Sequence, residues 1–208
     1  MKRLAILGAS GHGKVLADTA TKLGWSEILF FDDAYPAKKA NSHWSIVGNT
    51  QKLIESLVGF DGVVVAIGSN SVRLEKTLLL KSKGARLTTL VHPEANVSPF
   101  SFVGLGTFVG AGAAINIDAQ IGDACIINTN AVVEHDCLIG DAVHISPSCA
   151  LAGGVKVLTC SWIGIGACVK QLVEIGSNVI VGGGCVVIED LSDNITVVGN
   201  PACELVRE

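Results

Sequence analysis

His135 lies between two carboxylates in the segment Glu134-His135-Asp136. A carboxylate beside an imidazole raises the basicity of the ring and can fix its orientation, and both properties suit a general base near neutral pH. The pattern therefore suits a residue that takes a proton from an attacking nucleophile, although a lone histidine in such a position is more often a surface or interface residue. The alternative is a surface or interface histidine without a chemical role, which these three residues alone do not exclude.

A glycine-rich segment near the N-terminus, Gly8-Ala9-Ser10-Gly11-His12-Gly13-Lys14, follows a short apolar run. Its spacing is close to that of a phosphate-binding P-loop, but Val15 stands where Ser or Thr would hold Mg²⁺, so we reject an NTPase. Asp32 and Asp33 end the next apolar run, where an acidic residue can bind ribose hydroxyls. Together they predict a bound nucleoside diphosphate without hydride or phosphoryl chemistry. The alternative is a tight strand–helix turn and a solvated acidic pair.

Strands and helices that would position these residues alternate through the first ninety residues. Apolar runs predict strands over Arg3–Leu7, Ile28–Phe31, Ser45–Val47, Gly62–Ile67 and Leu87–Val91. Helices are predicted over Val15–Leu23, Gln51–Val58 and Val72–Lys83. This order indicates an α/β unit with a parallel sheet covered on both faces. Ligands of such sheets bind beyond the carboxyl ends of the strands, where the glycine segment and the Asp pair lie.

A six-residue period begins where this pattern ends. From Val97 to Val187 every sixth residue is Val, Ile or Leu, sixteen times without an insertion. The next residue is often Gly, and the residue four places on is usually small. The period matches neither the 3.6 residues of an α-helix turn nor the 2 of a strand. Repeated hexapeptides are typical of a parallel β-helix.

Composition and charge exclude several classes of protein. With 15 Lys and Arg against 19 Asp and Glu, the net charge of −4 argues against a partner that is nucleic acid. Hydrophobic residues make up 49% and charged residues 16%, which excludes a disordered chain. No uncharged apolar run reaches the roughly 18 residues needed to cross a bilayer, and residues 1–8 lack the features of a signal peptide. We therefore expect a cytoplasmic protein without a membrane partner.

Seven cysteines occur, an odd number without a CxxC pair, so neither a disulfide framework nor a zinc ribbon is predicted. Four of them fall on the small position of the repeat and are expected to pack inside the coils: Cys125, Cys137, Cys149 and Cys185. Three others lie off that position and receive no predicted role: Cys160, Cys168 and Cys203.

The segments 128–136 and 139–147 resemble sugar acetyltransferases related to the sialic-acid O-acetyltransferases and the bacterial UDP-4-amino-sugar N-acetyltransferases of glycan synthesis. The segments 8–14, 31–33 and 198–202 share this resemblance, which therefore spans the whole chain. It implies a Rossmann-like nucleotide-sugar-binding domain over residues 1–91. A left-handed parallel β-helix with three hexapeptides per coil, carrying acetyl-CoA and the catalytic residues, would follow over residues 92–208.

The resemblance also implies roles for individual residues. His135 corresponds to the catalytic base of the family and Asp136 to the acidic residue beside it. Residues implied at acetyl-CoA are His144, Gly153 (through its backbone N–H at the thioester carbonyl), Ile165 and Gly183. Residues implied at the nucleotide sugar are Gly11, His12, Gly13, Asp32, Asp33, Gly68 and Asn70.

The implied reaction is direct N-acetylation of a UDP-linked amino sugar, such as UDP-4-amino-4,6-dideoxy-N-acetylhexosamine, by acetyl-CoA, without a metal. The implied assembly is a homotrimer with each active site between two subunits. One alternative within the class is O-acetylation of sialic acid. A zinc carbonic anhydrase on the same fold would need three histidine ligands, whereas the repeat region holds only His135 and His144. A non-enzymatic trimer that binds nucleotide sugars is the remaining alternative.

Overall fold

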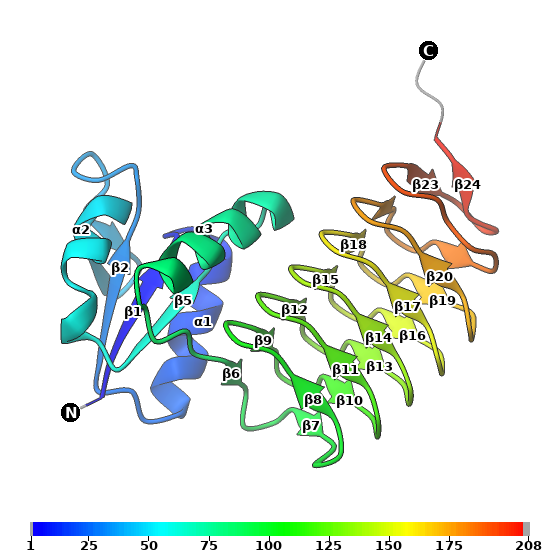
Figure 1. Ribbon diagram of the computed structural model, residues 1–208, viewed down its shortest axis with the longest axis horizontal. Coiled ribbons are helices and arrows are strands. Elements are labelled where there is room, and N and C mark those ends of the chain that lie inside the picture. Colours follow the sequence, from blue (N-terminus) through cyan, green and yellow to red (C-terminus); the bar gives the residue numbers. More distant parts are fainter. Residues whose placement is uncertain (1, 206–208) are drawn as a thin grey trace. The chain divides into compact units, whose positions relative to one another are not determined.

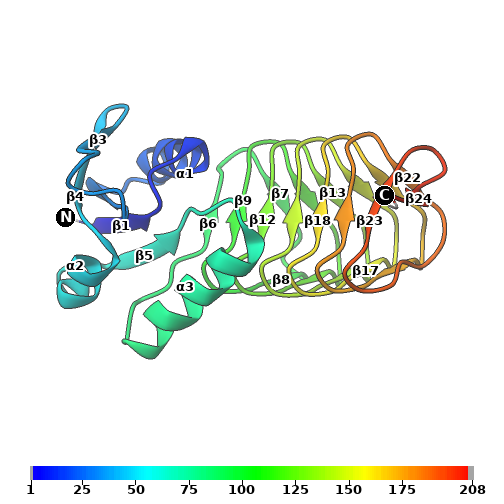
Figure 2. The ribbon, with the colours of Figure 1, turned by 90° about the horizontal axis from the view of Figure 1, so that it is seen from above.

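A computed structural model describes residues 2–205 of the chain (Figures 1 and 2). The chain divides into two compact units, residues 1–93 and residues 94–208, and each is described by itself. In the described range no helix combines the length and the apolar character that crossing a bilayer requires.

The first unit is the expected α/β sheet. Its strand order is β3-β4-β2-β1-β5, parallel except for the β3–β4 pair. The strands are β1 (Arg3–Leu7), β2 (Glu27–Phe31), β3 (Ala40–Asn41), β4 (Trp44–Gly48) and β5 (Gly62–Val65). The helices are α1 (Gly11–Lys22), α2 (Thr50–Glu55), a 3₁₀ turn (Leu57–Gly59) and α3 (Asn70–Ser82). The central strand β1 is buried from Leu4 onward, which accounts for its continuous apolar sequence.

Several boundaries in this unit differ from the sequence prediction, most clearly the start of α1 and the last strand. Helix α1 begins at Gly11 rather than Val15, with Ser10 at its N-cap, so most of the glycine-rich segment forms a helical turn rather than a loop. The predicted last strand is shortened. Leu87 makes only an isolated bridge to Val63, and Leu90–Val91 form the separate strand β6. Thr88 and Thr89 interrupt the apolar run there. Such polar residues are tolerated in a short segment at the edge of a sheet.

The second unit is a parallel β-helix of two-residue strands (Figure 1). Its strands β7 to β22 are Asn96–Val97, Phe102–Val103, Phe108–Val109, Ala114–Ile115, Gln120–Ile121, Ile126–Ile127, Val132–Val133, Leu138–Ile139, His144–Ile145, Ala150–Leu151, Lys156–Val157, Trp162–Ile163, Cys168–Val169, Glu174–Ile175, Ile180–Val181 and Val186–Val187. The second residue of each is the aliphatic residue of the predicted repeat. Strand partners are eighteen residues apart, as in Ile115 and Val133, which confirms three hexapeptides per coil.

Three sheets form the faces of this prism. One face has the order β22-β19-β16-β13-β10-β7 and a second β20-β17-β14-β11-β8. On the third, β9, β12, β15, β18 and β21 lie side by side. β23 (Thr196–Val198) and the antiparallel β24 (Cys203–Glu204) extend this third face.

The coils turn at left-handed backbone positions that also recur every six residues. From 106 to 184 each such position has a positive φ: Gly106, Gly112, Asp118, Ala124, Asn130, Asp136, Ala142, Ser148, Gly154, Cys160, Gly166, Leu172, Asn178 and Gly184. A second set of glycines follows the aliphatic residue and permits close stacking. At Gly110 an added Cβ would lie 2.8 Å from the backbone nitrogen of Thr129 on the next coil.

The four cysteines on the small position lie inside the prism as expected. Cys125, Cys137, Cys149 and Cys185 are buried, and none of the four forms a disulfide. Burial raises the pKa of the Cys137 and Cys149 thiols, so they stay protonated and unreactive at neutral pH. Cys160 occupies a left-handed corner of the coil, a position that the sequence analysis did not recognise.

Candidate active site

His135 stands at the corner of the β-helix that follows β13. Its Nδ1 lies 2.7 Å from Oδ2 of Asp136, and both side chains are more than half exposed. Because the carboxylate can only accept, the neutral ring donates its Nδ1 proton to Asp136 and keeps the Nε2 lone pair available. Asp136 takes the left-handed conformation (φ 60°) that the corner requires and that Asp tolerates well. The fold thus presents His135 as an oriented base.

Electrostatics around His135 favour its protonated form. The pKa of the imidazole is raised by the hydrogen bond to Asp136, against a smaller opposing effect of burial, and further by the charges of Asp136 and Glu134. Glu134 is itself held by Asn116 one coil away, whose amide donates to its Oε2 at 2.8 Å. A raised pKa makes the ring a stronger proton acceptor, as a general base needs.

Gly153 lies directly against the His135 ring, one coil on. A Cβ added to Gly153 would lie 2.5 Å from both Cε1 and Nε2 of the imidazole, and its three nearest atoms all belong to that ring. Gly154 donates its backbone N–H to the His135 carbonyl at 2.9 Å. The absence of a side chain at Gly153 therefore makes room for the imidazole.

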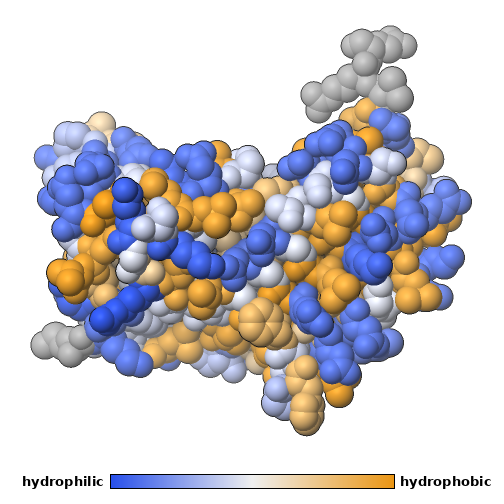
Figure 3. Space-filling model, viewed as in Figure 1, coloured by the Kyte–Doolittle hydropathy of each residue, from blue (hydrophilic) through white to orange (hydrophobic). Residues whose placement is uncertain are grey.

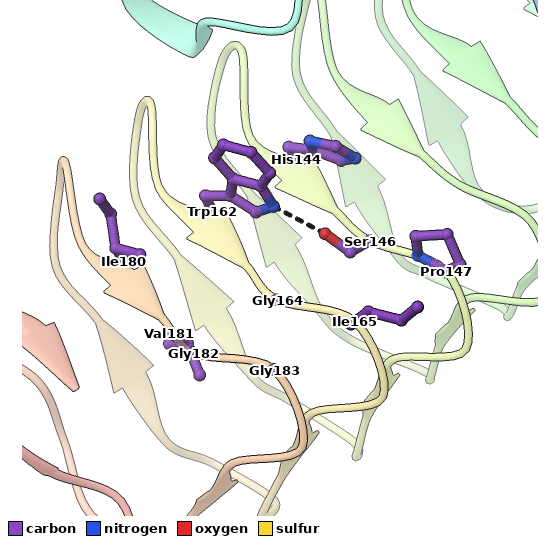
Figure 4. Close-up of a pocket in the computed structure, with 10 residues that line it drawn as sticks. All are labelled: His144, Ser146, Pro147, Trp162, Gly164, Ile165, Ile180, Val181, Gly182 and Gly183. Carbon is purple, nitrogen blue, oxygen red and sulfur yellow. Dashed lines mark hydrogen bonds between the residues drawn. The ribbon is translucent and has the colours of Figure 1, made fainter. Parts of the chain in front are cut away.

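A groove of about 470 Å³ runs across three successive coils of a different face, that of β15, β18 and β21 (Figure 4). It is mostly apolar, and it includes three of the residues predicted at acetyl-CoA. Its lining consists of His144, Ser146, Pro147, Trp162, Gly164, Ile165, Ile180, Val181, Gly182 and Gly183. Since coils are about 4.8 Å apart, the groove extends roughly 10 Å along the prism axis. Its shape suits an extended, largely apolar arm.

Figure 4 shows the indole of Trp162 beside the His144 ring at one end of this groove. The two rings stack with centroids 5.1 Å apart and planes 19° apart, and the indole N–H donates to Oγ of Ser146 at 2.7 Å. The predicted residues thus separate into two groups. His144, Ile165 and Gly183 line the groove, whereas Gly153 accompanies His135 and Asp136 at another corner.

The nucleotide-sugar residues predicted in the first unit lie at the carboxyl ends of β1, β2 and β5. Gly11, His12 and Gly13 form the first turn of α1, whose N–H groups and dipole attract anions. Asp32 joins the loop before α1 to the end of β2, because its carboxylate accepts the N–H of Ala9 at 2.7 Å. It also accepts the N–H of Ala34 at 2.9 Å.

Asp33 has different partners. Its Oδ1 accepts the Thr50 N–H at 2.9 Å, and Lys76 lies 3.6 Å from its Oδ2. Burial alone would raise the pKa of this carboxyl, but the hydrogen bonds from Thr50 and the charge of Lys76 outweigh it, and the pKa is lowered. Asp33 therefore stays ionised near neutral pH.

Arg73 organises the loop between β5 and α3, which carries Gly68 and ends at Asn70, the first residue of α3. This guanidinium is almost completely buried and donates to the carbonyls of Ile67 at 2.9 Å and Gly68 at 3.2 Å. It also donates to Oδ1 of Asn70 at 2.8 Å, so the Asn70 side chain takes part in holding the loop.

Replacing Arg73 by Met is expected to destabilise the first unit by about 1–3 kcal/mol, because it leaves the buried amide oxygen of Asn70 and two partly buried carbonyls without their donor. Chemical denaturation followed by circular dichroism measures the effect. The exposed Arg86, replaced in the same way, serves as the matched control. Equal stability of the two variants would contradict the structural role of Arg73.

Comparisons with known proteins agree with this arrangement. Residues 3–77 match the PglD N-terminal domain family, and residues 118–153 match the bacterial transferase hexapeptide (six repeats) family. The acetyltransferase domain of PglB from Neisseria gonorrhoeae FA1090, solved with acetyl coenzyme A, is 40% identical with a TM-score of 0.94, covering 98% of this chain and 99% of that one. The chain belongs to the PglD-like family of hexapeptide-repeat sugar acetyltransferases.

Two further relatives show the range of the PglD-like family. PerB from Caulobacter crescentus, solved with CoA and GDP-perosamine, is 38% identical with a TM-score of 0.94 and covers 99% of this chain and 98% of that one. The UDP-N-acetylbacillosamine N-acetyltransferase of Bacillus subtilis (strain 168) is 38% identical over 117 residues, 53% of this chain. That match spans about half of the Bacillus protein, 52% of its length.

Several residues of the site escaped the sequence analysis of this PglD-like chain. Trp162 and Ile180 were within reach of the repeat, because they lie eighteen and thirty-six residues after His144 and so share its outward position. Asn128 contacts His144, because Nδ2 of Asn128 lies 3.2 Å from Nε2 of His144. The coil period does not predict this contact. Among residues 2–205 no cluster of three or more His, Cys, Asp or Glu side chains could hold a metal ion.

Replacing Asp136 by Asn tests the electrostatic role of this acid while keeping a residue that accepts the left-handed corner. Loss of the carboxylate should lower the pKa of His135, because the largest contribution to its elevation disappears. The base is active when deprotonated, so the acid limb of the pH profile of kcat/KM should move to lower pH. The maximal rate should fall as well, because the ring loses its orienting acceptor. A profile with an unchanged acid limb would contradict the pairing.

Proposed function

We propose that the protein transfers the acetyl group of acetyl-CoA to the amine of a UDP-linked amino sugar, with His135 as general base. The oriented pair of His135 and Asp136 is the observation that carries this proposal. The neutral amine attacks the thioester carbonyl while Nε2 of His135 accepts a proton from the nitrogen. The tetrahedral intermediate then collapses, the C–S bond breaks, and CoA leaves as the thiolate or thiol. This direct route uses no metal and no covalent enzyme intermediate.

Acetyl-CoA is proposed to lie in the groove lined by His144, Ile165 and Gly183, with its thioester toward His144. The groove offers an apolar channel along the coil axis that fits a pantetheine arm. The PglB domain and PerB, both similar over almost the whole chain, were solved with acetyl coenzyme A and CoA respectively. The backbone N–H of Gly153 is proposed to bind the thioester carbonyl as negative charge develops on its oxygen.

The nucleotide sugar is proposed to bind through the first turn of α1, Asp32, Asp33 and the loop of Gly68 and Asn70. Phosphate oxygens would meet the N–H groups at the helix end. The carboxylates offer acceptors for ribose hydroxyls or base N–H groups, and the lowered pKa of Asp33 keeps it an acceptor at neutral pH.

A homotrimer with sites between subunits accounts for the separation of the two groups of residues. His135 follows a strand of one prism face, whereas His144 and the groove belong to another. A site that uses both would combine the His135 corner of one copy with the groove of the next. A second apolar depression, lined in part by Phe102, Leu138 and Leu158, also leaves hydrophobic surface for a partner copy. Figure 3 shows hydrophobic residues at the surface of one face of the molecule, interspersed with polar ones.

Purified protein should release free CoA from acetyl-CoA when given a UDP-4-amino sugar, with mass spectrometry showing a product 42 Da heavier. The increase of about 42 Da corresponds to the replacement of one amine hydrogen by an acetyl group. A panel of UDP-, GDP- and CMP-linked sugars and free sialic acid decides the acceptor. Absence of acetylation on every amino sugar in the panel would overturn the proposal.

A GDP-linked amino sugar is the second candidate acceptor. PerB, similar over 99% of this chain, was solved with GDP-perosamine, whereas the Bacillus relative named for a UDP sugar matches over only about half of its length. Preferential kcat/KM with the GDP sugar in the same panel would select this candidate over the UDP sugar.

A further inference from the structure

Asn128 has a fixed amide orientation. Its side-chain oxygen accepts the backbone N–H of Thr129 at 2.8 Å, and the Thr129 hydroxyl lies 3.5 Å from the same oxygen. A backbone N–H can only donate, so the atom facing it must be the amide oxygen rather than the amide nitrogen. The nitrogen of Asn128 therefore points the other way, toward His144.

This orientation determines the form of the His144 ring. Nδ2 of Asn128 lies 3.2 Å from Nε2 of His144. An amide NH₂ group has no lone pair to offer, so Nε2 must accept the hydrogen bond and the neutral ring carries its proton on Nδ1. A proton on Nε2 would set two donors against each other. Turning the amide over would only move that conflict to the Thr129 N–H.

The groove lining beside His144 adds no charged side chain that would reverse this preference. Its strand neighbours in register are Ile126 and Trp162, and the Trp162 indole is held by its own hydrogen bond to Ser146. Within the described groove lining there is no Asp, Glu, Lys or Arg. The flat stack of imidazole on indole would favour a cationic ring, which opposes the effect of Asn128. That stack keeps the ring plane fixed in either state, whereas the Asn128 bond distinguishes the two nitrogens.

We propose that Asn128 is a positioning residue that holds His144 as the neutral Nδ1–H tautomer. On the proposed function, His144 then enters the acetyl-CoA site as an uncharged ring whose Nε2 is already occupied. It cannot act as a second general base, and His135 alone accepts the proton from the amine. Asn128 thereby leaves His135 as the general base and keeps His144 as a neutral ring that takes no proton.

NMR of the protein labelled with ¹⁵N-histidine tests this without a substrate, since the ring nitrogens of each tautomer have distinct shifts and couplings. The signal lost in His144→Gln identifies His144. We expect the neutral Nδ1–H pattern at pH 7 in the wild type. In Asn128→Asp the carboxylate still accepts from Thr129 but now also accepts from Nε2, so the signal should change to the Nε2–H or imidazolium form. Trp162→Phe keeps an aromatic partner and should leave the tautomer unchanged.

An Nε2–H or imidazolium signal in the wild type, or an unchanged tautomer in a folded Asn128→Asp variant, would overturn the proposal. If that variant does not fold, Asn128→Ser removes the amide donor and should give a mixed tautomer population. Because these spectra need no turnover, a protein that failed to acetylate any sugar would refute the proposed function and leave this result standing. In an active protein, Asn128→Asp should also add an ionisation to the pH profile of kcat/KM beyond that of His135.

Discussion

Replacing His135 by Ala is expected to lower kcat/KM for acetyl transfer by about 10²–10⁴-fold, the contribution of a positioned general base. The loss should appear mainly in kcat, because His135 lies outside the groove proposed for acetyl-CoA and its removal leaves that surface intact. The side chain is more than half exposed, so the free energy of unfolding should change little. Steady-state rates of CoA release with the preferred amino sugar measure the effect.

His43 provides the matched control, because it is also an exposed histidine but belongs to the first unit, whereas His135 belongs to the second. His43→Ala should retain the wild-type rate. Calorimetric titration of His135→Ala with acetyl-CoA should show wild-type affinity, which separates loss of the base from loss of binding. A His135→Ala variant with the full rate would remove His135 from the mechanism and leave the fold assignment untouched.

The β-helix could be predicted from the sequence almost residue by residue because its geometry is strictly periodic. Each aliphatic residue from Val97 to Val187 is the second residue of a strand, and each strand pairs with the strand eighteen residues away. The interior admits only small and branched side chains, so the constraint acts at every sixth position and leaves a clear pattern. The α/β unit has no such repeat. Its parallel strands β1, β2, β4 and β5 were predicted, but the short β3 was missed. The start of α1 was misplaced by four residues, because the glycines suggested a loop where they form a first helical turn.

The site was less predictable than the fold, because its contacts link residues that no local pattern joins. His135 and Asp136 are sequence neighbours, and their pairing follows from that. The placement of Gly153 under the imidazole depends on coil stacking, and the role of Asn128 depends on which way an amide turns. The position of Gly153 depends on a close approach between coils, and the orientation of Asn128 depends on a single hydrogen bond. Similarity to the family placed Gly153 at the coenzyme, and it did not reveal that Gly153 also faces the base.

Gly153→Ala is the substitution that separates activity from stability most sharply. The new methyl would lie 2.5 Å from Cε1 and Nε2 of His135, and the imidazole is the mobile end of a side chain, so the ring rather than the coil should move. Restoring ordinary van der Waals contact needs a displacement of about 1 Å, which can cost about 10²-fold in rate. Gly153 is not among the positive-φ positions, so Ala fits its backbone and the melting temperature should stay near that of the wild type.

A double-mutant cycle with His135→Ala decides whether the methyl acts through the base. If it does, adding Gly153→Ala to His135→Ala should change kcat/KM little, because no imidazole remains to be displaced. If the methyl instead disturbs the backbone N–H proposed to bind the thioester oxygen, the two losses should multiply. The cycle therefore assigns Gly153 either to positioning the base or to stabilising the oxyanion. A full rate in the single variant would exclude both roles and place the imidazole elsewhere during catalysis.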